Sequence, residues 1–418
     1  MDRIAIFGLG KMGLPLACAF AEKDFQVTGI DVNAEWVAKI NAKHDVLPQE
    51  PGVHAILAAT LGRKFTATTD SDVSGQDVII ILVPTLIHAT ENGVEADLGA
   101  ALQVATTIGR TLNKGSLVIT ECTMPPGATE KIGAAIEKVS GLKAGHDFGL
   151  SHCPERTSSG VALRDIRGQY PKVVGADDEP TRQKVSRLYE KINSKGVIAM
   201  PSIRMAECVK VFEGIYRDVN IGLSNELAKY CRTISVDAIE VFEAANTQPY
   251  CHLHMPSCGV GGHCIPYYPY FVMTSKTPII SAARQTNDSM PQFTVDLLAP
   301  KAGATVGLLG LTYRGGVKEF HKSPALDILR ILAEKKVHVV AHDPLCTDSE
   351  IRAIGAEPLA DYALDGLIVA SNHPEYRVLD WPRIIAQMHV KTVVDGCRAL
   401  DPQAIRNAGG KYVGVGRA

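Results

Sequence analysis

The most reactive side chain in the sequence is a cysteine that follows a run of glycines. Residues 257–266 read Ser-Cys-Gly-Val-Gly-Gly-His-Cys-Ile-Pro, and Cys264 follows the small residues after one histidine, His263. Small residues here let a ligand approach both the backbone and the thiol. A thiolate attacks an aldehyde to give a thiohemiacetal, which can lose a hydride and become a thioester that water hydrolyses to an acid. The pattern favours Cys264 as the nucleophile of such an oxidation.

Two other roles for this segment stay open from the residues alone. Cys264 could simply pack in a core, or the segment could bind zinc. Its possible zinc ligands are Cys251, His252, His254, Cys258, His263 and Cys264. Their spacing matches no common zinc finger or ribbon, and a glycine run is unusual for a structural zinc site. We therefore expect no bound metal, and metal analysis of the purified protein would test this expectation.

A second glycine pattern, near the N-terminus, is typical of dinucleotide binding. Residues 8–13 read G-x-G-x-x-G between an apolar segment and a helical pattern. Gly8 permits a tight turn, Gly10 lets a pyrophosphate approach, and Gly13 allows the helix to pack closely. Asp31, at the end of the next apolar segment, can accept hydrogen bonds from ribose hydroxyls and would repel a 2′-phosphate. The pattern predicts NAD rather than NADP, the alternative being a glycine turn without a ligand.

The elements around these motifs predict an α/β fold. Apolar segments alternate with helical patterns, which indicates doubly wound parallel sheets. The predicted strands are 4–7, 25–31, 77–84 and 115–120 in the first part, and 304–310, 336–340, 367–370 and 391–395 in the last. The two parts resemble each other, because each has a glycine turn and a second strand that ends at an aspartate, Asp31 or Asp343. We predict two Rossmann-like domains with a helical domain between them.

One long helix is predicted from about residue 200 to 230. Apolar residues recur along it at three- and four-residue steps: Ala206, Val209, Phe212, Tyr216, Val219, Leu223, Leu227 and Tyr230. A second line at helical spacing contains Lys210, Gly214, Arg217 and Ser224. A helix with two such faces, placed between two α/β regions, is expected to connect domains and to form a dimer surface. We predict domains at 1–197, 198–298 and 299–418.

Length and charge exclude several classes of protein. The chain has 418 residues, which at roughly 150 per domain predicts two or three domains. Its 43 Lys and Arg against 45 Asp and Glu give a net charge of −2, so no basic field attracts nucleic acid or anionic lipid. We expect neither a membrane span nor a signal peptide. Ten cysteines without a C-x-x-C pair predict a reducing, cytoplasmic location.

Taken together, short motifs along nearly the whole chain resemble the UDP-glucose/GDP-mannose dehydrogenase family. Within that family, the sequence is similar to the branch that acts on UDP-N-acetyl-mannosamine and related acetamido sugars. The motifs that carry the resemblance are Val83–Thr85, Glu121–Gly127, Cys153–Arg156, Ala206–Lys210, Tyr216–Ile221, Gly259–Pro266, Ala283–Asp288, Gly310–Arg314 and Ser323–Ala325. The resemblance implies oxidation of the C6 alcohol of a UDP-sugar to a carboxylate with two NAD, in a homodimer whose active site lies between domains.

The resemblance also assigns roles to residues. It implies that Cys264 is the nucleophile, that Lys210 stabilises developing oxyanions, and that Glu155 and Thr123 order water and assist proton transfer. The residues it implies for cofactor binding are Gly8, Gly10, Lys11, Met12, Gly13, Asp31, Pro84, Thr85, Thr123, Gly261 and His321. Those it implies for substrate binding are Glu155, Arg156, Thr157, Lys210, Arg217, Gly261, Arg284, Tyr313, Arg314 and Arg398, with Arg284 reaching the substrate of a partner subunit.

Chemistry alone leaves plainer roles open for some of these residues. Glu155 could cap a turn, Lys210 and Arg217 could lie on a solvated helix face, and Arg284 could form a local ion pair with the Asn-Asp sequence at 287–288.

The sequence departs from the family pattern at several positions. Gly214 stands where the family carries an asparagine that helps bind the oxyanion, and Tyr268 stands where it carries an aspartate that pairs with the lysine. Ser257 replaces a glycine, while Tyr250 and His321 replace arginines. Because losing one oxyanion donor typically costs about 10²–10³ in rate, three interpretations remain. The protein is a UDP-acetamido-sugar dehydrogenase, a dehydrogenase of UDP-glucose or another nucleotide sugar, or an impaired paralogue that binds NAD and a UDP-sugar.

Overall fold

Parallel sheets form both ends of the chain, as the alternation of apolar and helical segments predicts. The structure is a computed structural model that describes residues 3–90 and 93–417. The chain divides into two compact units. The first contains residues up to 213 together with 270–272, and the second contains 214–269 and residues from 273 onward.

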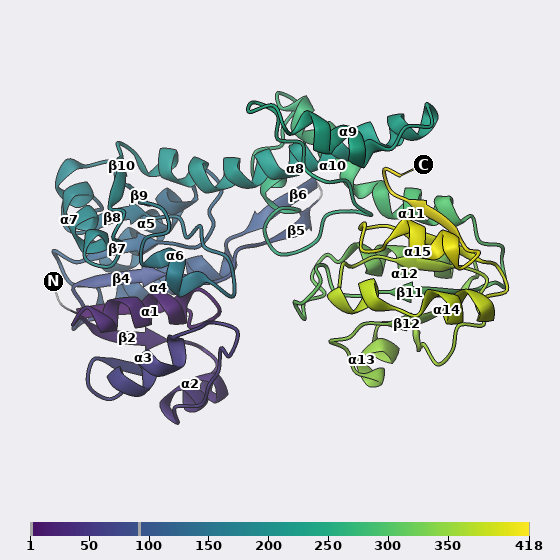
Figure 1. Ribbon diagram of the computed structural model, residues 1–418. Coiled ribbons are helices and arrows are strands. Elements are labelled where there is room, and N and C mark those ends of the chain that lie inside the picture. Colours follow the sequence, from purple (N-terminus) through teal and green to yellow (C-terminus); the bar gives the residue numbers. More distant parts are fainter. Residues whose placement is uncertain (1–2, 91–92, 418) are drawn as a thin grey trace. The chain divides into compact units, whose positions relative to one another are not determined.

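Within the described residues, the first unit contains an eight-stranded sheet (Figure 1). Its strand order is β10-β9-β8-β7-β4-β1-β2-β3, and all neighbours are parallel except β8 and β9. The strands are β1 (Arg3–Phe7), β2 (Gln26–Ile30), β3 (Phe65–Thr68), β4 (Val78–Ile81), β7 (Leu117–Thr120), β8 (Gly149–His152), β9 (Lys172–Gly175) and β10 (Val197–Met200). Strand β4 is buried along its whole length, as expected when helices cover both faces of a sheet.

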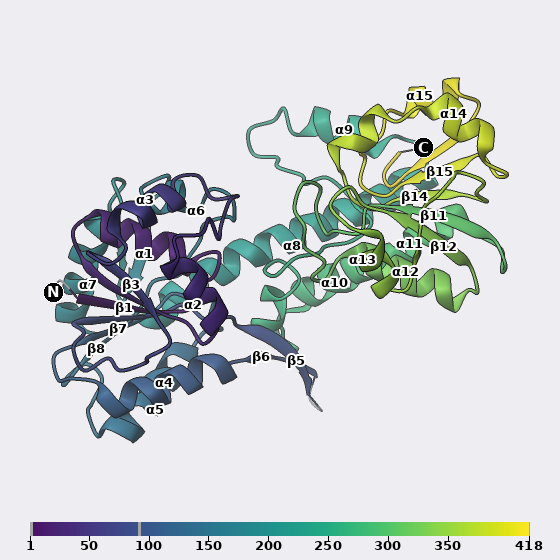
Figure 2. The same cartoon turned by 90° about the horizontal axis from the view of Figure 1, so that it is seen from below.

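Helices cover both faces of this sheet (Figure 2). One face packs on α1 (Gly13–Glu22), α2 (Ala34–Asn41), α3 (Val53–Thr60), α6 (Ala162–Ile166) and α7 (Glu179–Glu190). The other face packs on α4 (Gly99–Thr111) and α5 (Ala128–Ser140). The sequence pattern did not predict the antiparallel hairpin β5 (Leu86–Thr90) and β6 (Gly93–Asp97), which follows β4.

The second unit contains a six-stranded parallel sheet among the described residues, in the order β13-β12-β11-β14-β15-β16. Its strands are β11 (Thr305–Leu309), β12 (His338–His342), β13 (Glu357–Pro358), β14 (Leu367–Val369), β15 (Thr392–Asp395) and β16 (Lys411–Gly414). Helices α11 (Met290–Leu298), α12 (Pro324–Glu334) and α13 (Asp348–Ala353) pack on one face. Helices α14 (Trp381–Gln387) and α15 (Pro402–Asn407) pack on the other, and η2 (Pro374–Val378) precedes α14.

The predicted similarity between the two ends is confirmed at the level of hydrogen bonds. Each sheet has the strand order 3-2-1-4 followed by further strands, which is the order of dinucleotide-binding folds. The Gly8 N–H donates to the Ile30 carbonyl at 2.8 Å, and the Gly310 N–H donates to the His342 carbonyl at 2.8 Å. Both glycines adopt positive φ, +95° and +86° respectively. The fold is therefore two Rossmann-like domains with helices between them.

The middle of the chain contains the predicted long helix. Helix α8 (Ile203–Thr233) has 31 residues, begins in the first unit and ends in the second. It is followed by α9 (Ala238–Ala245), the short η1 (Tyr268–Phe271) and α10 (Pro278–Asp288). Part of the predicted apolar stripe on α8 is exposed, namely Phe212, Tyr216, Leu223 and Tyr230. None of the helices in the described ranges is long and apolar enough to cross a bilayer.

Candidate active site

The glycine turn after β1 has the geometry that a dinucleotide requires. A Cβ on Gly8 would lie 2.4 Å from the Leu82 carbonyl oxygen, and one on Gly13 would lie 1.8 Å from the Gly8 carbonyl oxygen. Both positions therefore exclude any side chain. A Cβ on Gly10 would meet nothing within 4 Å, so the backbone there is open to a ligand. Helix α1 starts at Gly13 with no side-chain cap, which leaves its positive end available to phosphate.

A cavity of about 380 Å³ lies beside this turn. It is lined by Gly10, Lys11, Asp31, Asn33, Trp36, Val46, Leu47 and Gln49. The Asp31 carboxylate accepts the Leu9 N–H at 2.9 Å, and the Trp36 indole donates to the Leu9 carbonyl at 2.8 Å. Asp31 is thus held at the cavity wall, and it remains partly exposed. An uncapped helix end and a carboxylate at the ribose position fit NAD.

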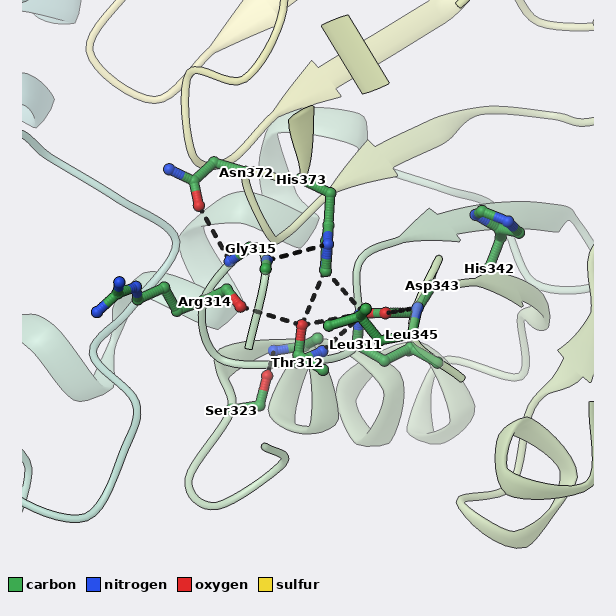
Figure 3. Close-up of polar contacts among 12 residues, drawn as sticks. Leu311, Thr312, Arg314, Gly315, Ser323, His342, Asp343, Leu345, Asn372 and His373 are labelled. Atoms are coloured by element: carbon green, nitrogen blue, oxygen red, sulfur yellow. Dashed lines mark hydrogen bonds and ion pairs between the residues drawn. The ribbon is translucent and has the colours of Figure 1, made fainter. Parts of the chain in front are cut away.

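The equivalent turn of the second unit is closed by its own side chains, as Figure 3 shows. One Asp343 carboxylate oxygen accepts the N–H groups of Leu311 and Thr312 at 2.8 and 3.0 Å, and it also contacts the Thr312 hydroxyl and the His373 Nε2 at 3.1 Å each. Burial alone would raise the pKa of Asp343, but these hydrogen bonds hold it well below its usual value. Helix α12 begins only at Pro324, so no helix N-terminus follows the turn directly. In the second unit, the turn therefore offers neither a free carboxylate nor a helix N-terminus, the two features that suit the turn of the first unit to NAD.

Glu155 lies just after β8, and it is linked to the glycine turn. Its side chain is 5% exposed, and one carboxylate oxygen accepts the Thr157 N–H at 2.7 Å. The Thr157 hydroxyl in turn contacts the Met12 sulfur at 3.1 Å. The structure therefore brings together three residues that the resemblance assigned separately to cofactor and substrate.

Glu155 is part of a buried ion network whose other members were not among the site residues predicted from the sequence. The Lys172 Nζ, on the first residue of β9, lies 2.6 Å from a Glu121 oxygen and 3.2 Å from a Glu155 oxygen. The Tyr189 hydroxyl of α7 donates to the other Glu121 oxygen. The signal that could have revealed this network is a lysine that opens the apolar Val-Val-Gly strand.

Charges in this network shift the pKa values in opposite directions. Burial raises the pKa of Glu121 to about 7, against the opposing attraction of Lys172. Burial also acts on Glu155, but Lys172, Lys210 and the Thr157 hydrogen bonds outweigh it and hold the Glu155 pKa below its ordinary value. Glu155 is thus a carboxylate at neutral pH, as a proton acceptor must be.

Three further assigned residues of the first unit lie after the ends of adjacent strands. Pro84 and Thr85 follow β4, and Thr123 follows β7, the strand next to it. Ligands of doubly wound sheets bind at these carboxyl ends. Lys210 is half-buried on α8. The neighbouring thiols of Cys122 and Cys153 are buried, and burial raises the pKa of each to about 12, so neither is a nucleophile.

The cysteine loop belongs to the second unit and is fixed to its sheet domain at two points. The Cys258 N–H donates to the Gly396 carbonyl at 2.7 Å, and the Gly262 N–H donates to the His321 carbonyl at 2.9 Å. A Cβ on Gly261 would lie 2.6 Å from the Tyr313 Cβ, so this glycine permits close packing of the loop. Two residues assigned to ligand binding, Gly261 and Tyr313, are therefore in contact.

Cys264 ends this loop with an accessible thiol. Among the ten cysteines, all of which fall in the described residues, Cys264 alone is exposed, and all ten are free thiols. The Cys264 carbonyl accepts the N–H groups of Tyr267 and Tyr268 at 3.0 and 3.1 Å, which starts the turn into η1. The core-packing alternative for Cys264 does not match this exposure.

The two main departures from the family pattern, Gly214 and Tyr268, are in direct contact with each other. A Cβ on Gly214 of α8 would lie 1.9 Å from the Cδ2 of the Tyr268 ring. Tyr268 is buried against the helix at that point, in space that any larger residue at 214 would need. Gly214 and Tyr268 therefore depend on each other, and the ring fixes the turn that contains Cys264.

His263, His321 and Tyr267 form a stacked group beside the loop. The rings of His263 and His321 are 4.0 Å apart and nearly parallel at 7°. His321 contacts the Tyr267 hydroxyl through Nε2, and His263 Nε2 lies 3.2 Å from Glu319. Burial and the neighbouring His263 lower the pKa of His321, so at neutral pH it does not carry the charge of the arginine it replaces.

The assigned arginines differ in how they are held. Arg156 pairs with Glu213 at 2.7 Å, whereas Arg217 and Arg314 are exposed. Arg398 adopts a φ of +56°, and its buried Nε has no hydrogen-bond partner among the described residues. An orphaned guanidinium nitrogen in a strained backbone suits an anionic ligand.

Arg284 forms the local ion pair that the sequence left open as an alternative. Its side chain is 3% exposed and pairs with Asp218 of α8 and with Asp288, the latter at 3.0 Å. Asn287 also donates to Asp218, at 2.9 Å. The guanidinium is thus held by carboxylates of its own chain.

The possible zinc ligands do not gather in one place. His254 meets Tyr216 edge to face, His263 stacks on His321, and Cys258 is buried against the Ala370 carbonyl. In the ranges 3–90 and 93–417, no three His, Cys, Asp or Glu side chains form a metal-binding group.

Comparison with known proteins identifies the family. Three models of the UDP-glucose/GDP-mannose dehydrogenase family match the chain: the NAD binding domain over residues 2–193, the central domain over 204–289 and the UDP binding domain over 307–402. The chain belongs to this family. It is accordingly a member of a family of NAD-dependent nucleotide-sugar dehydrogenases, which are oxidoreductases, and its first domain is the NAD-binding one.

The chain is similar over nearly its full length to named relatives. It is 33% identical to the UDP-N-acetyl-D-mannosamine dehydrogenase of Pyrococcus horikoshii over 99% of both chains. The solved structure of UDP-D-ManNAc dehydrogenase from that organism matches with a TM-score of 0.89, covering 99% of each chain. The chain is also 30% identical to the NDP-N-acetyl-D-galactosaminuronic acid dehydrogenase of Ralstonia solanacearum, over 93% of this chain and 95% of the relative.

Proposed function

We propose that this protein oxidises the C6 alcohol of a UDP-linked 2-acetamido hexose to the uronate, with UDP-N-acetyl-mannosamine as the first candidate substrate. The observation that carries the proposal is the exposed thiol of Cys264 on a glycine loop that is hydrogen-bonded to the UDP-binding domain. The names of the relatives support an acetamido sugar. UDP-glucose or another nucleotide sugar is the alternative substrate.

The reaction comprises two oxidations and one hydrolysis. The C6 alcohol first loses a hydride and a proton and becomes an aldehyde. The Cys264 thiolate adds to the aldehyde carbon, and the resulting thiohemiacetal loses a second hydride to give a thioester. Water then cleaves the thioester into the carboxylate and the free thiol. NAD supplies the hydride acceptor in each of the two oxidations, so two NADH form per sugar.

The chain supplies charge and proton acceptors for these steps. The Lys210 ammonium stabilises the negative charge that develops on the C6 oxygen. Glu155, held ionised in its buried network, accepts a proton from the attacking water, and Thr123 orders that water. Gly8, Gly10 and Asp31 hold the dinucleotide, while Tyr313, Arg314 and Arg398 hold UDP. The unpaired Nε of Arg398 supports its assignment to a phosphate.

The wider organisation is also part of the proposal. The domains are 1–197, 198–298 and 299–418, and the exposed apolar residues of α8 form a homodimer interface. The free state of all ten cysteines supports a reducing, cytoplasmic location. The reach of Arg284 toward a partner subunit's substrate stays a prediction. Replacing the exposed Leu223 by glutamate should shift the sedimentation coefficient from dimer to monomer.

The test is a panel of nucleotide sugars with NADH and product both measured. UDP-N-acetyl-mannosamine should yield two NADH per sugar and a uronate identified by mass spectrometry. One NADH with an aldehyde product would refute complete oxidation. Faster turnover of UDP-glucose than of UDP-N-acetyl-mannosamine would identify UDP-glucose as the preferred substrate instead.

A second candidate is a protein that binds NAD and a UDP-sugar without turnover. The Tyr268 ring packed at Gly214 favours it, because two polar groups of the family pattern are missing there. Binding of both ligands by calorimetry with no NADH from any sugar of the panel would establish this second candidate.

A further inference from the structure

The buried charges behind Glu155 form a closed set. Lys172 contacts Glu121 and Glu155, and the side chains of the three are 11%, 0% and 5% exposed. Lys172 also lies over the Tyr189 ring, 5.1 Å from its centroid. One ammonium thus serves two carboxylates, and the trio carries one surplus negative charge, which burial penalises.

The histidine, cysteine and tyrosines around this trio are neutral, and the two nearby arginines are each paired with another carboxylate, which leaves Lys210 as the other cation. Burial, with Lys210 and Lys172, lowers the pKa of His152 to about 3. Burial raises the pKa values of the groups that could become anions, which are Cys153, Tyr170 and Tyr189. Arg156 is paired with Glu213, and Arg164 with Asp165. Lys172 is therefore the cation in direct contact with Glu155.

The two carboxylates are held differently, which decides where a proton binds. Glu155 receives the Thr157 N–H at 2.7 Å in addition to Lys172, and it feels Lys210. Glu121 lies deeper, against Lys172 and the Tyr189 hydroxyl. A backbone N–H stabilises the ionised form of the carboxylate it contacts more than the neutral form. The proton that relieves the surplus charge near neutral pH therefore goes to Glu121.

From this geometry we propose that Lys172 is a positioning residue that keeps Glu155 ionised and fixed, and that Glu121 competes with Glu155 for the Lys172 charge and binds the proton of the network. The inference rests on the proposed function insofar as Glu155 is the proton acceptor of that reaction. It assigns to β7, β9 and α7 a part in setting the pH at which the enzyme works.

Two substitutions should affect the acidic limb of the pH–rate profile differently. Lys172→Met removes the cation, so the Glu155 pKa rises and the limb moves up by about one pH unit or more. Glu121→Gln should leave the limb in place, because Glu121 already holds its proton at the pH where Glu155 titrates. Lys172→Arg retains the cation and should restore a limb near that of the unmodified protein. An equal shift in Lys172→Met and Glu121→Gln, or no shift in Lys172→Met, would overturn the proposal.

Glu50→Gln is the matched control, because Glu50 is a buried carboxylate of the same unit that accepts the Ala162 N–H at 2.9 Å. It should leave the limb in place, and a shift equal to that of Lys172→Met would overturn the proposal.

Infrared spectroscopy of protein labelled with ¹³C-glutamate tests the network without turnover. A carboxyl band that titrates near pH 7 should be present in the unmodified protein and absent from Glu121→Gln, and in Glu155→Gln it should titrate at lower pH, because the surplus negative charge is gone. A band that still titrates near pH 7 in Glu121→Gln would refute the assignment of the proton. If the unmodified protein oxidises no sugar but the band behaves as expected, the proposed function fails and the network stands.

Discussion

The contact between Gly214 and Tyr268 allows a quantitative prediction. An alanine at 214 would place its Cβ 1.9, 2.7 and 3.0 Å from three carbons of the Tyr268 ring. The shortest of these distances is about 1.6 Å less than an ordinary carbon–carbon contact. Because the ring is buried, it must shift, and since the Tyr268 N–H donates to the Cys264 carbonyl, that shift would disturb the turn that contains Cys264.

The stability effect follows from two opposing terms. Replacing glycine by alanine inside a helix normally stabilises by about 0.5–1 kcal/mol, whereas overpacking a core costs about 1–3 kcal/mol. Gly214→Ala should therefore destabilise the second unit by about 1–2 kcal/mol. In a Tyr268→Ala background the clash is absent, and Gly214→Ala should then stabilise the second unit. The coupling between the two sites is then about 2 kcal/mol.

The chain offers a selective probe for this measurement. Its two tryptophans are Trp36 in the first unit and Trp381, buried in the core of the second. In a Trp36→Phe background, urea unfolding followed by tryptophan fluorescence reports the second unit alone. Gly222→Ala is the control, because its Cβ would meet Ala283 rather than Tyr268 and should show no coupling to Tyr268. Additive free energies for Gly214→Ala and Tyr268→Ala would refute the reasoning.

Three further predictions concern the nucleotide sites. Asp31→Ala should weaken NAD binding about 10- to 100-fold by calorimetry, because it removes a charged hydrogen-bond acceptor worth about 1.5–3 kcal/mol; unchanged affinity would contradict the site. Asp343 has a lowered pKa, so its stabilisation is present above the unfolded pKa of about 4 and is lost at more acid pH. The stability difference between Asp343→Asn and the unmodified protein should therefore shrink as pH falls below about 4, and a difference independent of pH would oppose this. Arg398→Met should weaken UDP binding at least about 10-fold without changing NAD affinity, and equal losses for both ligands would indicate a general structural defect.

Local patterns made much of the fold predictable. A glycine turn, an apolar strand and a terminal aspartate lie close together in the sequence, so the positions of Gly8 and Asp31 in a dinucleotide-binding turn follow from local spacing. The same pattern at Gly310 and Asp343 predicted the second sheet. The pattern could not indicate that the Asp343 carboxylate is already hydrogen-bonded to His373 and Thr312, because the contact with His373 joins residues that are 30 positions apart in the sequence.

The rest of the site depends on contacts that leave no local pattern. Lys172 meets Glu121 across 51 residues, and neither position has a spacing that indicates its partner. The fit of Tyr268 to Gly214 likewise joins a loop to a helix, so the sequence presented two unexplained departures where the structure has one. Side-chain complementarity between distant segments is a property of packing, and periodicity does not report it.

The most direct test of the central claim is the detection of substrate bound covalently to Cys264. Glu155→Gln should slow hydrolysis of the thioester, so rapid quenching with NAD and UDP-N-acetyl-mannosamine should trap the sugar on the enzyme. Peptide mass spectrometry is then expected to locate the added mass on the peptide that contains Cys264, with none in the Cys264→Ala variant. Formation of uronate without any adduct, or an adduct on another cysteine, would contradict the proposed chemistry.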